Sequence, residues 1–202
     1  MEFTHSSLIQ IFMVFTAVFV IWHCNLSKRH HQILATILVC NLVCEIICTV
    51  LKSKEVNHNL FLNAGTIIHH TLWLTMLYVT IHNIKMFQVV ILVYVSLASV
   101  YVFILNNPHQ FSTYAFISGA LIYIAIFLYT IIYHLFKENF SFFSNNVILL
   151  CAPLLLLIGF SCVFAFEATI LYDTLVIGKW SLYDLISTFV NAVYYTLINI
   201  YI

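Results

Sequence analysis

Charged side chains are scarce in this sequence. Its 202 residues include only seven Lys or Arg and seven Asp or Glu, and 63% of its residues are hydrophobic. A soluble domain has about 25% charged residues, whereas this chain has 7% and cannot cover a globule of its size in water. High hydrophobicity excludes a disordered chain, and balanced charge leaves no basic surface for nucleic acid. The sequence therefore predicts a chain that is solvated by lipid.

Glycine and proline are also few, with four and two residues. Four glycines cannot supply a G-x-x-x-x-G-K-[ST] phosphate loop, and the G-x-S-x-G elbow of serine hydrolases is absent. The stretch 182–202 has no lysine, which excludes a retinal Schiff base there. These absences predict a protein that is not an enzyme, although an intramembrane enzyme of unrecognised type stays open.

Long apolar runs dominate what is present. A membrane-spanning helix needs about 20 mostly apolar residues, and the qualifying windows do not alternate as barrel strands would. The sequence therefore predicts an all-α, polytopic membrane protein. It is expected to be a seven-transmembrane-helix bundle in a single domain over residues 1–202, with short loops joining antiparallel neighbours. The predicted helices cover residues 7–26, 33–51, 60–81, 87–105, 114–135, 146–166 and 182–202.

Basic residues in the short loops predict the orientation. Lys28 and Arg29 lie in the first predicted loop, whereas the segment before the first helix has no Lys or Arg. This difference predicts an N-terminus outside the cell and a C-terminus in the cytoplasm. The expected location is a bacterial inner membrane, which the chain crosses several times.

Cysteine and histidine spacing gives no metal-site pattern. All six cysteines fall in predicted helices and form no C-x-x-C pair, so we expect packing residues without a disulfide framework. None of the ten histidines has another histidine three or four positions away, which is the spacing that a helical metal site needs. We therefore predict no metal and no cofactor.

Glu45 is the strongest candidate functional residue. Placing an ionisable group inside a bilayer costs about 2.5–3.5 kcal/mol on insertion scales, so such a group is a candidate by default. Asn41 lies one turn earlier on the same helix face, and both side chains should point into the bundle. Glu45 could join helices through hydrogen bonds. Alternatively, it could have a ligand-binding, proton-coupled or gating role.

His69 and His70 lie in the middle of the third predicted helix. Adjacent helical residues are about 100° apart, so the two imidazoles cannot share a face. One of them could face the bundle and pair with Glu45, which would account for two buried polar groups at once.

The last predicted helix carries a polar stripe along one face. Asn191 can bond to a neighbouring helix, so the stripe is explained either by interhelical hydrogen bonds or by a polar pocket. The stripe consists of Asp184, Thr188, Asn191, Tyr195 and Asn199. The predicted pocket consists of Glu45, Asn41, His69, His70, Asn191 and Tyr195.

Pro153 and Gly159 lie well inside the sixth predicted helix. Proline removes a backbone donor and should kink the helix, and Gly159 permits close packing. That the helix moves about a hinge at Pro153 and Gly159 is a hypothesis.

Several segments along nearly the whole chain resemble one family. They are 40–47 with its mid-helix Glu45, 59–69, 111–114, 187–191 with its Asn191, and 194–198. They are similar to segments of the uncharacterised seven-helix membrane proteins of Bacteroidetes, which are often encoded near sensor histidine kinases. The chain departs at His69, where the family often has Glu, and around Pro153. The resemblance implies a multipass inner-membrane protein linked to signalling, and it implies no catalytic residue.

The predicted function is a non-enzymatic integral membrane sensor or signalling subunit with an intramembrane polar pocket. The alternative is a pore-forming or effector membrane protein, such as an accessory of a phage-defence locus, whose polar stripes line the channel of an oligomer. The expected partners are the lipid bilayer and either a membrane protein partner or a homo-oligomer, with no direct nucleic-acid contact.

Overall fold

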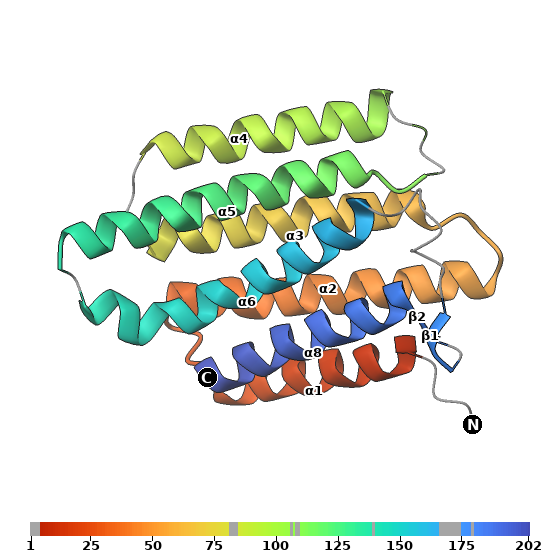
Figure 1. Cartoon of the computed structure of the whole chain (residues 1–202), viewed down its shortest axis with the longest axis horizontal. Coiled ribbons are helices and arrows are strands. Elements are labelled where there is room, and N and C mark those ends of the chain that lie inside the picture. Colours follow the sequence, from red (N-terminus) through yellow and green to blue (C-terminus); the bar gives the residue numbers. More distant parts are fainter. Residues whose placement is uncertain are drawn as a thin grey trace. The chain divides into compact units, whose positions relative to one another are not determined.

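The computed structural model describes residues 5–80, 85–105, 107, 110–138, 140–165, 175–178 and 180–202. In these residues the chain is almost entirely helical (Figure 1), and an all-α membrane bundle is confirmed. The α-helices are α1 (His5–His23), α2 (Arg29–Ser53), α3 (Asn59–Thr80), α4 (Lys85–Val100), α5 (Thr113–Phe136), α6 (Phe140–Ala165) and α8 (Leu182–Tyr201). A π-helical segment, η1 (Tyr101–Leu105), continues α4, and strands β1 (Leu175–Ile177) and β2 (Trp180–Ser181) pair antiparallel.

The helix ends differ from the predicted windows where polar residues continue or stop a helix. The α2 helix begins at Arg29 and ends at Ser53, and α6 begins at Phe140. Hydropathy marks the part that a bilayer would cover, whereas the backbone hydrogen bonds continue into polar residues. The α1 helix ends early, at His23, because Asn25 forms a turn in which its side-chain oxygen accepts the Ser27 N–H at 3.0 Å.

Four helical stretches in the described residues are long and apolar enough to cross a membrane. They are α2, α5, the continuous stretch Phe87–Leu105 of α4 and η1, and Val147–Ala165 of α6. The apolar stretch Leu8–His23 of α1 is shorter. That α1, α3 and α8 also cross a membrane stays a prediction.

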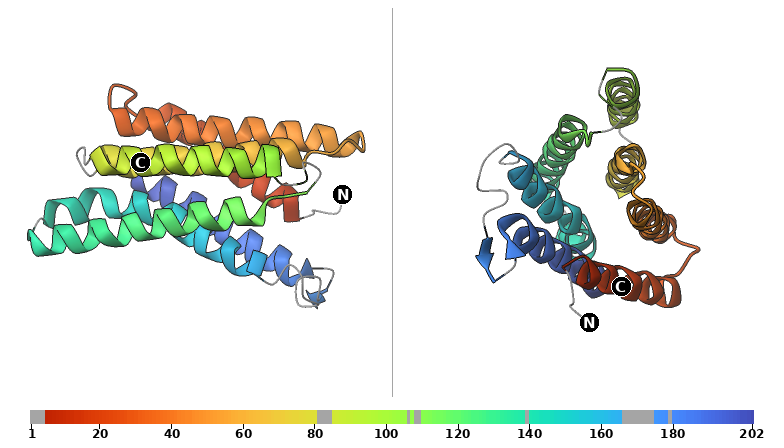
Figure 2. Two further views of the ribbon diagram at one scale, coloured as in Figure 1. Left: turned by 90° about the horizontal axis from the view of Figure 1, so that it is seen from above. Right: turned by 90° about the vertical axis from the view of Figure 1, so that its right-hand side faces the viewer.

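Residues Cys24–Phe140 form one compact unit around α3. The helices α2, α4 and α5 each pack against α3, which is seen end-on between α2 and α4 in the right-hand view of Figure 2. Large α3 side chains, including Trp73, Met76 and Leu77, are completely buried. Burial of large apolar side chains against three neighbours makes α3 the core helix of this unit.

The second compact unit combines Met1–His23 with Ser141–Ile202. Within it α1 packs along α8. The β1–β2 hairpin leads into α8, which begins with a capping box: Ser181 Oγ accepts the Asp184 N–H, and Asp184 Oδ2 accepts the Ser181 N–H, each at 3.1 Å. Asp184, the only acidic residue of the predicted stripe, therefore caps a helix. The single-domain organisation stays a prediction.

Candidate functional site

His70, in the middle of α3, is the buried centre of a junction of three helices. Its side chain is only 1% exposed, and its Nδ1 lies 2.8 Å from the carbonyl oxygen of Thr66 on the same helix. The Phe116 ring of α5 meets the imidazole edge to face at 5.0 Å, and the Tyr94 ring of α4 lies 6.1 Å away. One imidazole therefore lies against aromatic side chains of both α4 and α5.

The second ring nitrogen of His70, Nε2, is buried and makes no hydrogen bond of good geometry with the described residues, although the Phe116 backbone of α5 also interacts with this imidazole. A carbonyl oxygen only accepts hydrogen bonds, so Nδ1 must donate to Thr66, and Nε2 of the neutral ring is then an acceptor. An unsatisfied acceptor in a protein interior costs about 1–3 kcal/mol. Buried polar atoms are nearly always paired with protein groups, water or a ligand, so Nε2 is a candidate contact for a donor that enters the junction.

Gly119 of α5 makes the close approach to His70 possible. A Cβ at this position would lie 2.5 Å from His70 Cδ2 and 2.6 Å from Tyr94 Oη. Carbon atoms do not approach other heavy atoms that closely, so any larger residue must displace the imidazole or the phenol. Gly119 therefore closes the junction from the α5 side.

His69 turns away from this junction. Its Nε2 accepts a hydrogen bond from Trp73 Nε1 at 3.1 Å, one turn further along α3. The His69 and His70 rings are nearly perpendicular, at 82°. The two imidazoles have different hydrogen-bond partners, in keeping with adjacent helical positions that are about 100° apart.

Glu45 and Asn41 are half-buried on α2, the helix that packs against α3. Their neighbour Cys44 makes one contact between α2 and α3, with its Sγ 3.7 Å from the carbonyl oxygen of Phe61. His70 contacts side chains of α4 and α5. The pairing of Glu45 with either histidine stays a prediction.

Asn191 and Tyr195 belong to α8, in the unit that contains α1 and α6. Asn191 Nδ2 donates to the Ser187 carbonyl oxygen of its own helix at 2.8 Å, and the Tyr195 ring packs 4.9 Å from that of Tyr194. That they share a pocket with the α2 and α3 residues stays a prediction.

Another member of the stripe, Asn199, makes a hydrogen bond between α8 and α1. Asn199 Nδ2 donates to Thr16 Oγ1 of α1 at 3.0 Å, and Thr16 is completely buried. Sequence reasoning missed Thr16. The hydroxyl of a threonine in an apolar helix can also bond to a backbone carbonyl of its own helix, so the residue type does not indicate an interhelical bond.

The predicted hinge lies in a continuous helix. The α6 helix runs through Pro153 without interruption, and a Cβ at Gly159 would overlap with Val190 Cγ1 of α8. Gly159 therefore permits close α6–α8 packing, whereas motion at Pro153 stays a hypothesis.

No family model, curated protein or solved structure matches this chain. The resemblance to the Bacteroidetes membrane proteins therefore stays a hypothesis. Any functional assignment has to come from the chemistry of the site.

Sequence reasoning also missed the residues that surround His70. Tyr94, Phe116 and Gly119 are ordinary residues of apolar windows, and only packing brings them to one imidazole. Asn63 was missed although it gave a signal, because it is a polar amide inside an apolar window. Its Oδ1 accepts the Ser112 N–H at 2.8 Å, and its Nδ2 donates to a backbone carbonyl in the segment before α5 at 3.0 Å.

Thiols and metal-ligating side chains are the other reactive groups in the described part of the chain. There, no three His, Cys, Asp or Glu side chains gather as a metal site would require. The six cysteines are free thiols. Burial raises the pKa of the Cys24 thiol, which lies between α1 and α2, so it stays protonated at neutral pH.

Proposed function

We propose that this chain is a non-enzymatic membrane sensor or signalling subunit whose sensing site is the junction around His70. One observation carries the proposal: among the described residues, the acceptor nitrogen Nε2, buried between α3, α4 and α5, has no hydrogen-bond partner of good geometry. A ligand that donates a hydrogen bond to Nε2 would satisfy this atom. Because Tyr94 and Phe116 contact the same imidazole, such binding would change how α4 and α5 pack on α3.

The free energy of this hydrogen bond is large enough to shift a conformational equilibrium. Satisfying a buried acceptor is worth about 1–3 kcal/mol. A coupling free energy of that size changes an equilibrium by about 5–150-fold. Binding at one atom could thus shift the population of two helix arrangements.

The location and assembly of the protein belong to the same proposal. We propose a bacterial inner-membrane protein with seven spans, an external N-terminus, and a cytoplasmic C-terminus. Its signal would pass to a membrane protein partner or to a second copy. The four apolar stretches support the membrane location, and the absence of a nucleophile motif supports a role without catalysis.

The sensor is tested with His70→Asn and His70→Gln. The Asn amide can donate to the Thr66 carbonyl as Nδ1 does, but it places no group at Nε2, whereas the Gln amide reaches that position. The full chain is placed in nanodiscs, and hydrogen–deuterium exchange is measured before and after addition of a lipid extract of the expressing membrane. We expect exchange across α3, α4 and α5 to change by about 5–150-fold in the wild type, to change partly in the Gln variant, and to stay constant in the Asn variant.

Two results would contradict the sensor. One is an unchanged exchange pattern in the wild type, or an equal change in the Asn variant. The other is ion conductance by the purified wild type in planar bilayers, which would favour the pore.

The orientation is tested by reporters at both ends. We expect a fusion after Ile202 to be active in the cytoplasm and a tag before Met1 to be accessible from outside, because Lys28 and Arg29 hold the first loop inside. Alkaline phosphatase and fluorescent-protein fusions measure this directly. Both ends on one side of the membrane would require an even number of spans and would exclude seven.

A further inference from the structure

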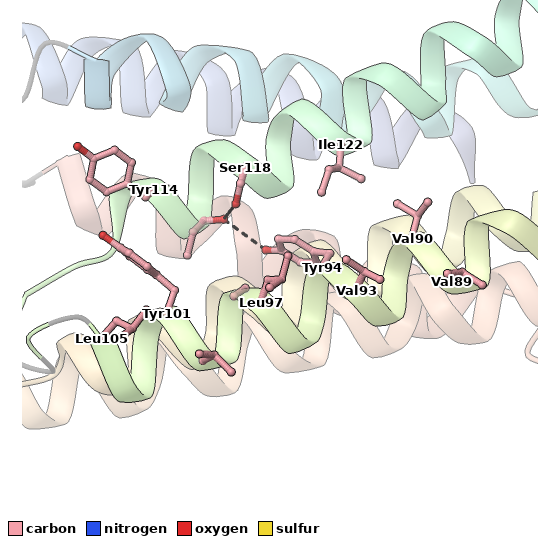
Figure 3. Close-up of a pocket in the computed structure, with 13 residues that line it drawn as sticks. Val89, Val90, Val93, Tyr94, Leu97, Tyr101, Leu105, Tyr114, Ser118 and Ile122 are labelled. Atoms are coloured by element: carbon pink, nitrogen blue, oxygen red, sulfur yellow. Dashed lines mark hydrogen bonds between the residues drawn. The ribbon is translucent and has the colours of Figure 1, made fainter.

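An apolar groove runs between α4 and α5 (Figure 3). Both helices pack against α3 but make little direct contact with each other in the described residues, which leaves a space of about 590 Å³. Tyr94, Ala98 and Ala115 are buried and form its floor. Its rim includes Val89 and Leu97, which are 61% and 65% exposed. The groove is therefore open on the outer face of two helices that are apolar enough to cross a bilayer.

The two ends of the groove differ in polarity. Tyr101 and Tyr114 face each other at one end, with their rings 6.0 Å apart, and both labelled phenols lie at the same end in Figure 3. Val90 and Ile122 line the other end. Tyrosines at helix ends are typical of the headgroup level of a bilayer, so the polar end of the groove lies where a lipid headgroup begins.

The length and chemistry of the groove suit an acyl chain. The α5 wall from Tyr114 to Ile122 is about 12 Å long at a rise of about 1.5 Å per residue. One leaflet of the hydrocarbon core is about 15 Å deep, half of about 30 Å. The lining contains no charged residue, so an extended peptide entering it would leave backbone groups unpaired. A hydrocarbon chain needs no such partners.

We propose that the groove between α4 and α5 binds one acyl chain of a phospholipid from the surrounding bilayer. The headgroup end of the chain lies at Tyr101 and Tyr114, and its methyl end lies towards Val90 and Ile122. The same chain lies over Tyr94, whose hydroxyl donates to the Ala115 carbonyl oxygen at 3.4 Å and whose ring neighbours His70. The groove and the His70 junction meet at Tyr94. Binding of the acyl chain does not rest on the proposed function, because a hydrocarbon chain offers no hydrogen-bond donor to His70 Nε2.

The experiment uses a photoactivatable phospholipid. The full chain is reconstituted into vesicles of palmitoyl-oleoyl-phosphatidylcholine that contain a small share of phosphatidylcholine with a diazirine on its acyl chain. After irradiation, labelled peptides are identified by mass spectrometry. We expect the groove walls to be labelled more heavily than the exposed α2 face at Val39 and Val43, which serves as an internal reference for ordinary bilayer contact.

Substitutions that fill the groove should remove the label. Ser118→Phe fills it from α5 and Val93→Phe narrows it from α4, so the label should fall by about tenfold or more in each, as for tenfold weaker binding. Leu128→Phe places the same aromatic side chain at an exposed α5 position outside the groove and should leave the label unchanged. Far-ultraviolet circular dichroism checks that each variant folds. If one filling variant fails to fold, the labelling of the other tests the proposal.

The acyl chain is excluded if the groove is labelled no more than the α2 face, or if both filling variants label like the wild type. Displacement of the label by palmitic acid, with none by unlabelled phosphatidylcholine, would contradict a phospholipid. Absence of groove labelling would contradict the acyl-chain site and would leave the His70 sensor to its own exchange experiment. Groove labelling without any His70 effect would leave an acyl-chain site without the proposed sensor.

Discussion

Replacing Asn63 with leucine is expected to destabilise the unit Cys24–Phe140 by about 2–4 kcal/mol. Asn63 is 1% exposed, and its amide holds both the Ser112 N–H and the Gln110 carbonyl oxygen. Ser112 is itself buried, and its Oγ accepts the Ala115 N–H at 3.3 Å, which caps α5. Leucine would leave the Ser112 N–H buried without an acceptor and would release the start of α5 from α3.

Thermal unfolding in detergent, followed by circular dichroism, measures this loss. Thr71→Val is the matched control, because Thr71 is a half-buried α3 residue whose hydroxyl bonds only to the Ile67 carbonyl of its own helix at 2.7 Å. Such a back-bond contributes little to helix stability, so the control should change the unfolding free energy by less than about 1 kcal/mol. Equal effects of both substitutions would show that the Asn63 bonds do not hold α5 to α3.

Placing a side chain at Gly119 is the second change with a large expected effect. Gly119→Ala should destabilise the same unit by about 1–3 kcal/mol through overpacking, and Gly119→Leu by more. The reason is the short distance from a Cβ at this position to both His70 Cδ2 and Tyr94 Oη. The neighbouring Ser118→Ala changes no close contact of this kind and is the control.

A double-mutant cycle separates this clash from a general effect on α5. His70→Ala removes the imidazole that the new methyl group would meet, so Gly119→Ala should cost less in that background. We expect a coupling free energy of about 0.5–3 kcal/mol between the two positions. Strictly additive effects would contradict the proximity of His70 and Gly119.

The amino-acid sequence by itself determined the class of the protein and the position of its helices. Apolar runs of membrane-spanning length can bury their backbone polar groups in lipid only as helices or closed barrels, and these runs do not alternate. The same reasoning placed His69 and His70 on different faces of one helix, because helical geometry is local. Helix ends were less predictable. The turn at Asn25 and the capping box at Ser181 depend on single side chains that a hydropathy window averages away.

Only the tertiary structure decided which residues surround His70. No sequence pattern links His70 to Tyr94 or Phe116. These side chains contact the imidazole because α4 and α5 both pack on α3. Gly119 became informative for the same reason, since a missing side chain matters only where another group fills its space. The groove likewise follows from two helices that share a neighbour without packing tightly together. Such relations join residues far apart in the chain, and no local pattern of polarity encodes them.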